Sequence, residues 1–286
     1  MEQSKSLPVA TRCGNTEFRW GERTYIMGIC NLSPDSFSGD GLGNDIELAV
    51  AQAERMVAEG ADIIDVGGES TRPGTEAKSV DDIDDELRLV IPVIERLASE
   101  LTVPISIDSY KSGVASRAVK AGAAMINDIW GLKRDPRIAE VAAEAGVPII
   151  LMSNQRDAPC PDIMPEVISD LERSIGLAMK AGVAEQNIII DPGVGFGKTL
   201  EQNLEIIQRL PELKSLGKPI LLGTSRKSVI GLVLDLPVDQ RLEGTAATIA
   251  IGIANGADMV RVHDVKQMVR VCRMSDAIIR RRQIGE

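Results

Sequence analysis

The chain of 286 residues carries a formal net charge of -10, and 44% of its residues are apolar while only 2% are aromatic. The acidic balance excludes a large nucleic-acid or membrane surface, because either partner would require a basic face. The apolar content allows a large aliphatic core, and the length is typical of one α/β barrel. Four scattered cysteines and an N-terminus without an apolar signal stretch predict a cytoplasmic protein with reduced thiols.

Short apolar runs alternate eight times with segments of helical period. We expect strands at 25–30, 61–67, 104–108, 124–128, 148–152, 187–191, 219–223 and 257–263. We expect helices at 46–59, 82–101, 111–121, 138–145, 163–181, 200–216, 242–255 and 265–282. Strand candidates that are hydrophobic almost throughout are typical of parallel strands buried on both faces.

Eight such βα units predict a closed (β/α)8 TIM barrel of the α/β class over residues 24–286. Residues 1–23 form an N-terminal segment, in which 10–23 would make a small hairpin on the barrel floor. A doubly wound open sheet is the alternative fold. The first βα turn, NLSPDSFSGDGLGND, lacks the G-x-G-x-x-G order that usually marks that fold. We therefore predict a single barrel domain.

Polar side chains end seven of the eight predicted strands, where the active sites of such barrels are built. Hydrogen-bond acceptors at Asp108, Asn127 and Asp191 would suit a flat heterocycle rich in N–H donors. Cations at these ends would suit phosphate or carboxylate oxygens, and they are Arg72, Arg226, Lys227, Arg261 and the single histidine, His263. For Asp128, capping of the next helix explains the residue as well as a ligand does.

Two long loops follow the first and second strands. Segments 31–41 and 70–80 are rich in serine, glycine and proline, and they contain Phe37 and Arg72. Loops of this kind often close over a substrate. The alternative is a plain solvated connection between barrel elements.

Seven motifs in chain order resemble those of the dihydropteroate synthases: MGICNLSPDSFS, DVGGESTRPG, ISIDS, INDIWG, DPGVGFGKT, GTSRKS and RVHDV. The resemblance runs from about residue 25 to about residue 270 and covers nearly the whole chain. It implies the barrel fold and a reaction of folate biosynthesis. In that reaction, hydroxymethyl-dihydropterin pyrophosphate and p-aminobenzoate give dihydropteroate and pyrophosphate.

The resemblance also implies roles for residues at the matching positions. For the pterin it implies Asp108, Asn127, Met152, Asp191 and Lys227. For the pyrophosphate it implies Asn31, Arg261 and His263, with Asn31 also a ligand of a Mg²⁺ cofactor. For p-aminobenzoate it implies Ser36, Phe37, Thr71, Arg72, Pro73, Phe196, Lys227 and Ser228. The residues implied in catalysis are Asp35, Asp108, Lys227, Arg261 and His263.

The implied chemistry needs no serine or cysteine nucleophile, because an amine attacks a carbon whose leaving group is already activated. The protein must instead stabilise charge on the departing pyrophosphate. If the bond breaks before the attack, Asp108 and Asp191 would stabilise a cationic pterin. The chain departs from the family after its fifth strand, where LMSNQ with Ser153 and Asn154 replaces the usual LMHM.

Two other functions stay open at the level of sequence. A methyltetrahydrofolate methyltransferase shares the pterin-binding barrel, but it should lack the Arg72 loop and TSRKS as a pair. A pterin-binding paralogue without synthase activity is the second alternative, and the intact Lys227, Arg261 and His263 disfavour it. The expected partners are the two small-molecule substrates, without nucleic acid or membrane. A homodimer is also expected, with close packing on the barrel wall as the other reading of the small residues in 244–255.

Overall fold

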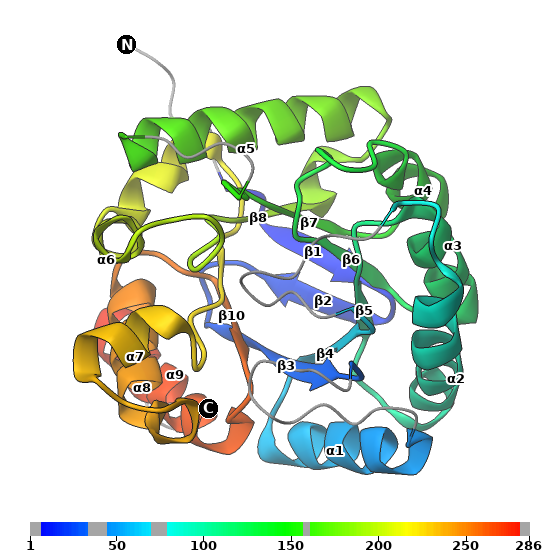
Figure 1. The fold of residues 1–286 in the computed structure, drawn as a ribbon, viewed down its shortest axis with the longest axis horizontal. Helices are drawn as coiled ribbons and strands as arrows, with labels where there is room; N and C mark the ends of the chain where they lie inside the picture. The colour runs from blue at the N-terminus through cyan, green and yellow to red at the C-terminus, as the bar shows by residue number, and fades with distance from the viewer. Residues whose placement is uncertain (1–6, 34–44, 70–78, 157–160, 281–286) are drawn as a thin grey trace.

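The computed structural model describes residues 7–33, 45–69, 79–156 and 161–280, and a ring of parallel strands surrounded by helices forms its centre (Figure 1). The strands of the ring are β3 (Tyr25–Asn31), β4 (Ile63–Gly67), β5 (Ile105–Asp108), β6 (Met125–Asp128), β7 (Ile149–Met152), β8 (Ile188–Asp191), β9 (Leu221–Leu222) and β10 (Met259–Val262). They pair in the order β8-β7-β6-β5-β4-β3-β10-β9. A parallel bridge between Ile190 and Ile220 joins β8 to β9 and nearly closes the ring. The predicted barrel and its eight strands are confirmed.

The N-terminal hairpin closes the floor of the barrel. Its strands β1 (Ala10–Cys13) and β2 (Thr16–Arg19) pair antiparallel, as the sequence predicts. Phe18 and Trp20 of this hairpin pack in one buried cluster with Met27, Ile63 and Met125, which point into the barrel. Because strand residues alternate between two faces, the intervening residues face outward and form the larger core beneath the helices.

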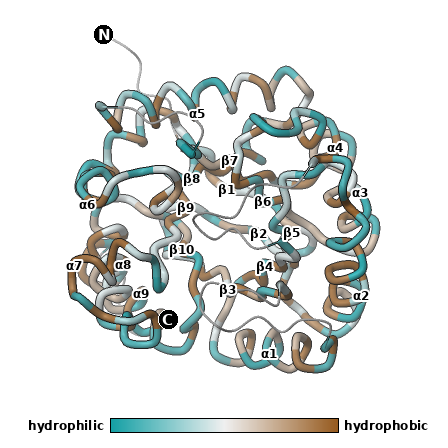
Figure 2. Tube along the Cα trace, viewed as in Figure 1, coloured by the Kyte–Doolittle hydropathy of each residue, from teal (hydrophilic) through white to brown (hydrophobic). Residues whose placement is uncertain are grey.

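Nine α-helices cover the described part of the barrel. They are α1 (Ile46–Glu59), α2 (Asp84–Glu100), α3 (Ser112–Ala121), α4 (Ile138–Ala145), α5 (Ile163–Lys180), α6 (Leu200–Gln208), α7 (Ser228–Leu234), α8 (Leu242–Ala254) and α9 (Val265–Ile279). Hydrophobic and hydrophilic residues alternate along them, as expected for helices with one face on the strands (Figure 2). Among the described residues, no helix combines the length and the apolar character that a bilayer span requires.

Two helix predictions are wrong in detail. The single helix expected at 200–216 is divided into α6 and a 3-10 helix, Leu210–Leu216. Pro211 explains the break, because proline has no N–H to donate and its ring clashes with the preceding turn. Helix α7 was not expected, because seven almost uniformly apolar residues give no helical period.

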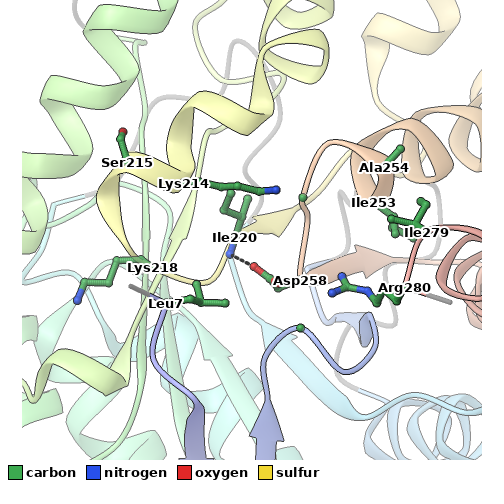
Figure 3. Close-up of a pocket in the computed structure, with 12 residues that line it drawn as sticks. Leu7, Lys214, Ser215, Lys218, Ile220, Ile253, Ala254, Asp258, Ile279 and Arg280 are labelled. Carbon is green, nitrogen blue, oxygen red and sulfur yellow. Dashed lines mark hydrogen bonds between the residues drawn. The ribbon is translucent and has the colours of Figure 1, made fainter. Parts of the chain in front are cut away.

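All strands of the ring run parallel, so their carboxyl ends lie at one end of the barrel. At the opposite end, a cavity of about 480 Å³ opens between the amino ends of β9 and β10. Asp258 accepts a hydrogen bond from the Ile220 N–H there, at 3.0 Å, and Lys214, Lys218 and Arg280 lie around it (Figure 3). This floor region is separated from the strand ends where the sequence places the chemistry.

Candidate active site

One row of residues crosses four adjacent strands at the carboxyl end of the barrel. Asn31 of β3 pairs with Gly67 of β4, Gly67 pairs with Asp108 of β5, and Asp108 pairs with Asn127 of β6. The strand register therefore brings together three of the predicted site residues. Gly67 leaves the middle of this row open, because a Cβ there would lie 3.6 Å from Asp108 Oδ2 and 3.8 Å from Asn31 Oδ1.

Arg261 reaches across the barrel mouth to two carboxylates. Its Nε lies 2.6 Å from Asp65 Oδ2, and its Nη2 lies 2.7 Å from Asp108 Oδ2. Asn127 Nδ2 donates to the same Asp65 oxygen at 3.0 Å. Asp65 is completely buried, and its second oxygen has no hydrogen-bond partner. The Asp65 carboxylate thus holds the side chains of Arg261 and Asn127, and Arg261 in turn holds Asp108.

The sequence analysis did not assign Asp65 to the site. A signal was present, because Asp65 is the one charged residue inside the apolar β4. A buried strand has no use for a carboxylate without a partner. The partner, Arg261, lies 196 positions away in the sequence, so the pair could be seen only in the fold.

The second half of the site surrounds another glycine. A Cβ at Gly223, after β9, would lie 3.8 Å from Lys227 Nζ, 3.8 Å from Arg261 Cβ and 3.9 Å from Asp191 Oδ2. The other oxygen of Asp191 accepts a hydrogen bond from the Gly193 N–H at 2.7 Å. One Asp191 oxygen is therefore fixed by the backbone, while the other faces the space that Gly223 leaves open.

We predict that Gly223→Ala weakens pterin binding without unfolding the protein. The added methyl group meets its neighbours at ordinary contact distance, so the barrel should keep its fold. It would occupy space between Asp191 and Lys227, and pterin affinity should fall by about tenfold or more. Calorimetric titration with 6-hydroxymethylpterin measures the change. Gly176→Ala on the surface of α5, where a Cβ meets nothing within 4 Å, is the control; equal affinities of the two variants would contradict the prediction.

Aromatic and sulfur-containing side chains line one wall of the site. Met152 at the end of β7 packs with Tyr110, Ile129, Trp130 and Phe196 in a separate buried cluster. Lys227 Nζ lies 4.6 Å from the centre of the Phe196 ring, and the Arg156 guanidinium lies 4.7 Å from it. The structure thus brings together Met152, Phe196 and Lys227, three of the predicted site residues. The wall that they form is suited to a flat ring.

His263 lies directly after β10 and contacts the loop after β9. Its Nδ1 is 2.9 Å from Ser225 Oγ, and its backbone N–H donates to the same oxygen at 3.2 Å. The expected position of the histidine beside TSRKS is confirmed. Ser225 was not predicted as a contact, and its hydroxyl, within hydrogen-bond distance of Nδ1, orients the imidazole ring. Ser228 begins α7 in the same loop.

We predict that His263→Ala lowers the affinity for pyrophosphate by about tenfold, since a hydrogen bond to a charged group contributes about 1.5–3 kcal/mol. The side chain is only half-buried, so the fold should be unaffected. Competition of pyrophosphate with the substrate measures the loss, and the affinity for 6-hydroxymethylpterin alone serves as the internal control. Wild-type pyrophosphate affinity in the variant would refute this role.

Burial perturbs the charges of the site. It raises the pKa of Asp108 to about 7, against the opposing effect of Arg261 and with a further contribution from Asp65. Burial also raises the pKa of Asp191, which Lys227 opposes. It lowers the pKa of Lys227 to about 8, although Asp191 acts in the other direction. Charges in such a poorly solvated place interact strongly with a ligand, which is typical of functional sites.

The residues that depart from the family pattern after β7 point away from the site. Ser153 Oγ donates to Asp170 Oδ2 of α5 at 2.9 Å, and Gln155 Nε2 donates to Ser153 Oγ at 3.0 Å. Asn154 Nδ2 donates to the Ile129 carbonyl at 3.0 Å. All three side chains are buried. They form a hydrogen-bond network behind the site. Met152 is the residue at the end of β7 that contributes to the wall of the site.

The remaining predicted site residues either lie outside the described residues or make contacts beside the site. Six lie outside the described residues: Asp35, Ser36, Phe37, Thr71, Arg72 and Pro73. Asp128 is described, and its carboxylate accepts from the N–H groups of Trp130 at 2.8 Å and Leu132 at 2.6 Å. Arg226 pairs with Asp264 through two hydrogen bonds. Asp128 and Arg226 thus stabilise the loops beside the site.

The residues present fit a magnesium ion only if the substrate supplies most of its ligands. No group of three or more His, Cys, Asp or Glu suited to a metal occurs in the described residues. Asn31 Oδ1 does lie at the open position above Gly67, on the same side as Asp108. Mg²⁺ prefers oxygen ligands and often keeps water and phosphate oxygens around one or two protein groups. An amide oxygen at this position meets that requirement.

Comparisons with known proteins show the family to which this chain belongs. The sequence model of the family described as pterin binding enzyme matches residues 27–263. The dihydropteroate synthase of Clostridium beijerinckii is 53% identical over 271 residues, covering 94% of this chain and all of the relative. A crystal structure of the Clostridium difficile dihydropteroate synthase in the presence of pteroic acid is 53% identical, with a TM-score of 0.86, and covers 91% of this chain and 98% of that chain. The Xanthomonas albilineans dihydropteroate synthase with 4-aminobenzoic acid is 40% identical, with a TM-score of 0.87, and covers 94% of this chain and 98% of that one.

The barrel with polar residues at its strand ends, together with the matching family model, defines a pterin-binding enzyme. The chain belongs to this family, and within it to the dihydropteroate synthases.

Proposed function

We propose that this transferase joins 6-hydroxymethyl-7,8-dihydropterin pyrophosphate to p-aminobenzoate. The convergence of Asp108, Asn127, Asp191, Lys227 and Arg261 around Gly67 and Gly223 is the observation that carries the proposal. The relatives solved with 4-aminobenzoic acid and with pteroic acid support both halves of the reaction. The amine nitrogen bonds to the exocyclic methylene carbon, the bond from that carbon to oxygen breaks, and its electron pair leaves with pyrophosphate. The amine then releases one proton.

In this proposal, the acidic and amide side chains bind the pterin, and the basic side chains bind the pyrophosphate. Asp191 and Asn127 accept and donate hydrogen bonds at the edge of the pterin, with Met152 against its face. Asp108 lies where positive charge develops on the pterin as the leaving group departs. Arg261 and His263 bind the departing pyrophosphate, and so stabilise the charge that forms in the transition state.

Lys227, Phe196 and Ser228 form the p-aminobenzoate side of the site. The Lys227 ammonium over the Phe196 ring places a cation beside the position of the aromatic substrate. Asn31, together with oxygens of the substrate, holds Mg²⁺, which withdraws charge from the pyrophosphate when bound. The loop residues that the resemblance implies, Asp35 and Arg72 among them, lie outside the described residues and belong to the site in this proposal.

Incubation of the purified protein with both substrates and Mg²⁺ tests the proposal. We expect dihydropteroate and pyrophosphate in equal amounts, and loss of product when the metal is chelated. Binding of the pterin without product would favour a non-catalytic pterin-binding protein. Methyl transfer from methyltetrahydrofolate without dihydropteroate would favour the methyltransferase alternative.

Among the described residues, Cys13, Cys30 and Cys272 are buried and form no disulfide. Cysteines outside disulfides are typical of a reducing compartment. We therefore place the reaction in the cytoplasm.

We also propose a homodimer formed through the adjacent helices α7, α8 and α9 (Figure 1). Leu232, Ile251 and Ile278 of these helices are large apolar side chains, and each is more than half exposed. The small residues of α8 have a separate cause, since a Cβ at Gly252 would lie 2.2 Å from a Leu222 side-chain carbon on the barrel wall. Apolar groups exposed on neighbouring helices indicate a surface that another chain covers.

Leu232→Glu should therefore shift the protein from dimer to monomer in sedimentation velocity experiments. A buried charge at the interface would cost several kcal/mol in each copy. Leu177→Glu is the matched control, because Leu177 is also an exposed leucine but lies on α5, across the barrel from these helices (Figure 1). A Leu232→Glu protein that sediments as the wild type does would exclude this interface.

A further inference from the structure

Lys198 lies half-buried between the ends of β7 and β8, and the proposed reaction gives it no role. Its ammonium donates to three backbone carbonyls: Ser153 at 2.9 Å, Gly193 at 2.9 Å and Phe196 at 3.2 Å. A lysine ammonium has three donors, so each of its N–H groups has an acceptor. The first carbonyl belongs to the loop after β7, and the other two belong to the loop after β8.

The loop after β8 carries or contacts several groups of the candidate site. The Gly193 N–H donates to Asp191, and the Val194 carbonyl accepts from Lys227 Nζ at 2.5 Å. Phe196 forms part of the wall beneath Lys227. Movement of this loop would therefore displace the aromatic wall and the lysine that lies over it.

The shape of this loop explains why it requires an internal cation. Gly193, Gly195 and Gly197 all have left-handed backbone angles, with φ of 72°, 85° and 70°. Such a segment makes no strand ladder, so its carbonyls need other partners. The two loops also approach closely, since a Cβ at Gly193 would lie 1.9 Å from the Ser153 oxygen. The Lys198 ammonium draws together carbonyls that would otherwise repel one another.

We propose that Lys198 is a positioning residue, which holds Phe196 at the correct distance from β7 and β8 for the p-aminobenzoate to bind. The inference rests on the proposed function. Asp191 lies inside β8 and pairs with Met152 through the strand ladder, so it keeps its place without Lys198. Phe196 has no such ladder; its backbone is fixed by Lys198 and by hydrogen bonds to Gly193 and Gln155. Loss of the ammonium should therefore affect the second substrate more than the pterin.

Steady-state kinetics and calorimetry of Lys198→Met test this proposal. We expect the KM for p-aminobenzoate to rise about tenfold, while the Kd for 6-hydroxymethylpterin changes less than about threefold. Lys198→Gln, which keeps two N–H donors on a shorter side chain, should recover part of the loss. Lys218→Met is the matched control, because Lys218 is a buried lysine that also donates to a backbone carbonyl, that of Glu185 on the barrel floor.

Several results would overturn the inference. One is an unchanged KM for p-aminobenzoate in folded Lys198→Met, and another is a parallel rise in the KM and in the pterin Kd. Unfolding of both Lys198 variants, with Lys218→Met folded, would assign Lys198 to stability alone. The same kinetic split in Lys218→Met would also contradict it. Absence of dihydropteroate from the wild-type protein is a different result, because it would refute the proposed function itself.

Discussion

Asp191→Asn should abolish measurable pterin binding. In the structure, the Gly193 N–H fixes one oxygen of Asp191, and the other oxygen faces the space above Gly223. An asparagine keeps its oxygen on the Gly193 N–H, because that donor needs an acceptor. Its NH₂ group then points into the site, where the pterin presents N–H donors of its own. The loss of one charged acceptor and the gain of an unpaired buried donor should cost about 3–5 kcal/mol, or at least about a hundredfold in affinity.

Calorimetric titration with 6-hydroxymethylpterin measures this loss, and Asp258→Asn is the matched control. Asp258 is equally buried and also accepts from one backbone N–H, that of Ile220, but at the barrel floor. The control variant should bind the pterin as the wild type does. If the Asp191→Asn protein is folded and keeps the wild-type affinity for 6-hydroxymethylpterin, Asp191 does not belong to the pterin site.

The strands of the barrel could be predicted because their sequence signal is local. Runs such as the three isoleucines before Asp191 are apolar and β-branched throughout, and this pattern occurs where both faces of a strand are buried. Helix α7 could not be predicted in this way, since its seven residues are too few to show a period. The break after α6 depends on Pro211, whose effect on a helix is known but was outweighed by the apolar pattern around it.

The site could be predicted only as a set of strand ends. A polar residue that follows an apolar run is visible in the sequence, and Asp108, Asn127 and Asp191 were found by that rule. Which of them face each other depends on register, as the row from Asn31 to Asn127 shows. The ion pair between Asp65 and Arg261 and the open spaces at Gly67 and Gly223 exist only in three dimensions. A glycine gives no sign in the sequence that the space beside it is reserved for a ligand.

Arg261→Met should reduce both turnover and stability. Arg261 is the shared partner of Asp65 and Asp108, so its loss leaves two buried carboxylates without a cation. Removing one partner of a buried ion pair costs about 3–5 kcal/mol in the free energy of unfolding. In the proposed reaction Arg261 stabilises the departing pyrophosphate, so its loss should also lower kcat by about a hundredfold or more.

The stability loss of this variant should depend on pH. Arg261 opposes the effect of burial on the pKa of Asp108, which is raised from 3.8 to about 7, so removal of the arginine raises that pKa further. A carboxyl whose pKa is raised on folding stabilises the protein fully below its unfolded value, and this contribution is lost as the pH rises through the folded value. The difference in free energy of unfolding between wild type and variant should therefore be small at pH 5 and larger at pH 8.

Urea unfolding at these two pH values measures the effect, and Arg23→Met provides the comparison. Arg23 also makes two hydrogen bonds to a carboxylate, that of Asp62, but at the amino end of the barrel and with a partly exposed side chain. Its loss should leave turnover intact and cost less stability, because water can replace the guanidinium. A pH-independent deficit in Arg261→Met would mean that Asp108 is already ionised in the folded protein at pH 5. In that case the ion pair between Arg261 and Asp108 stabilises the folded protein throughout this pH range.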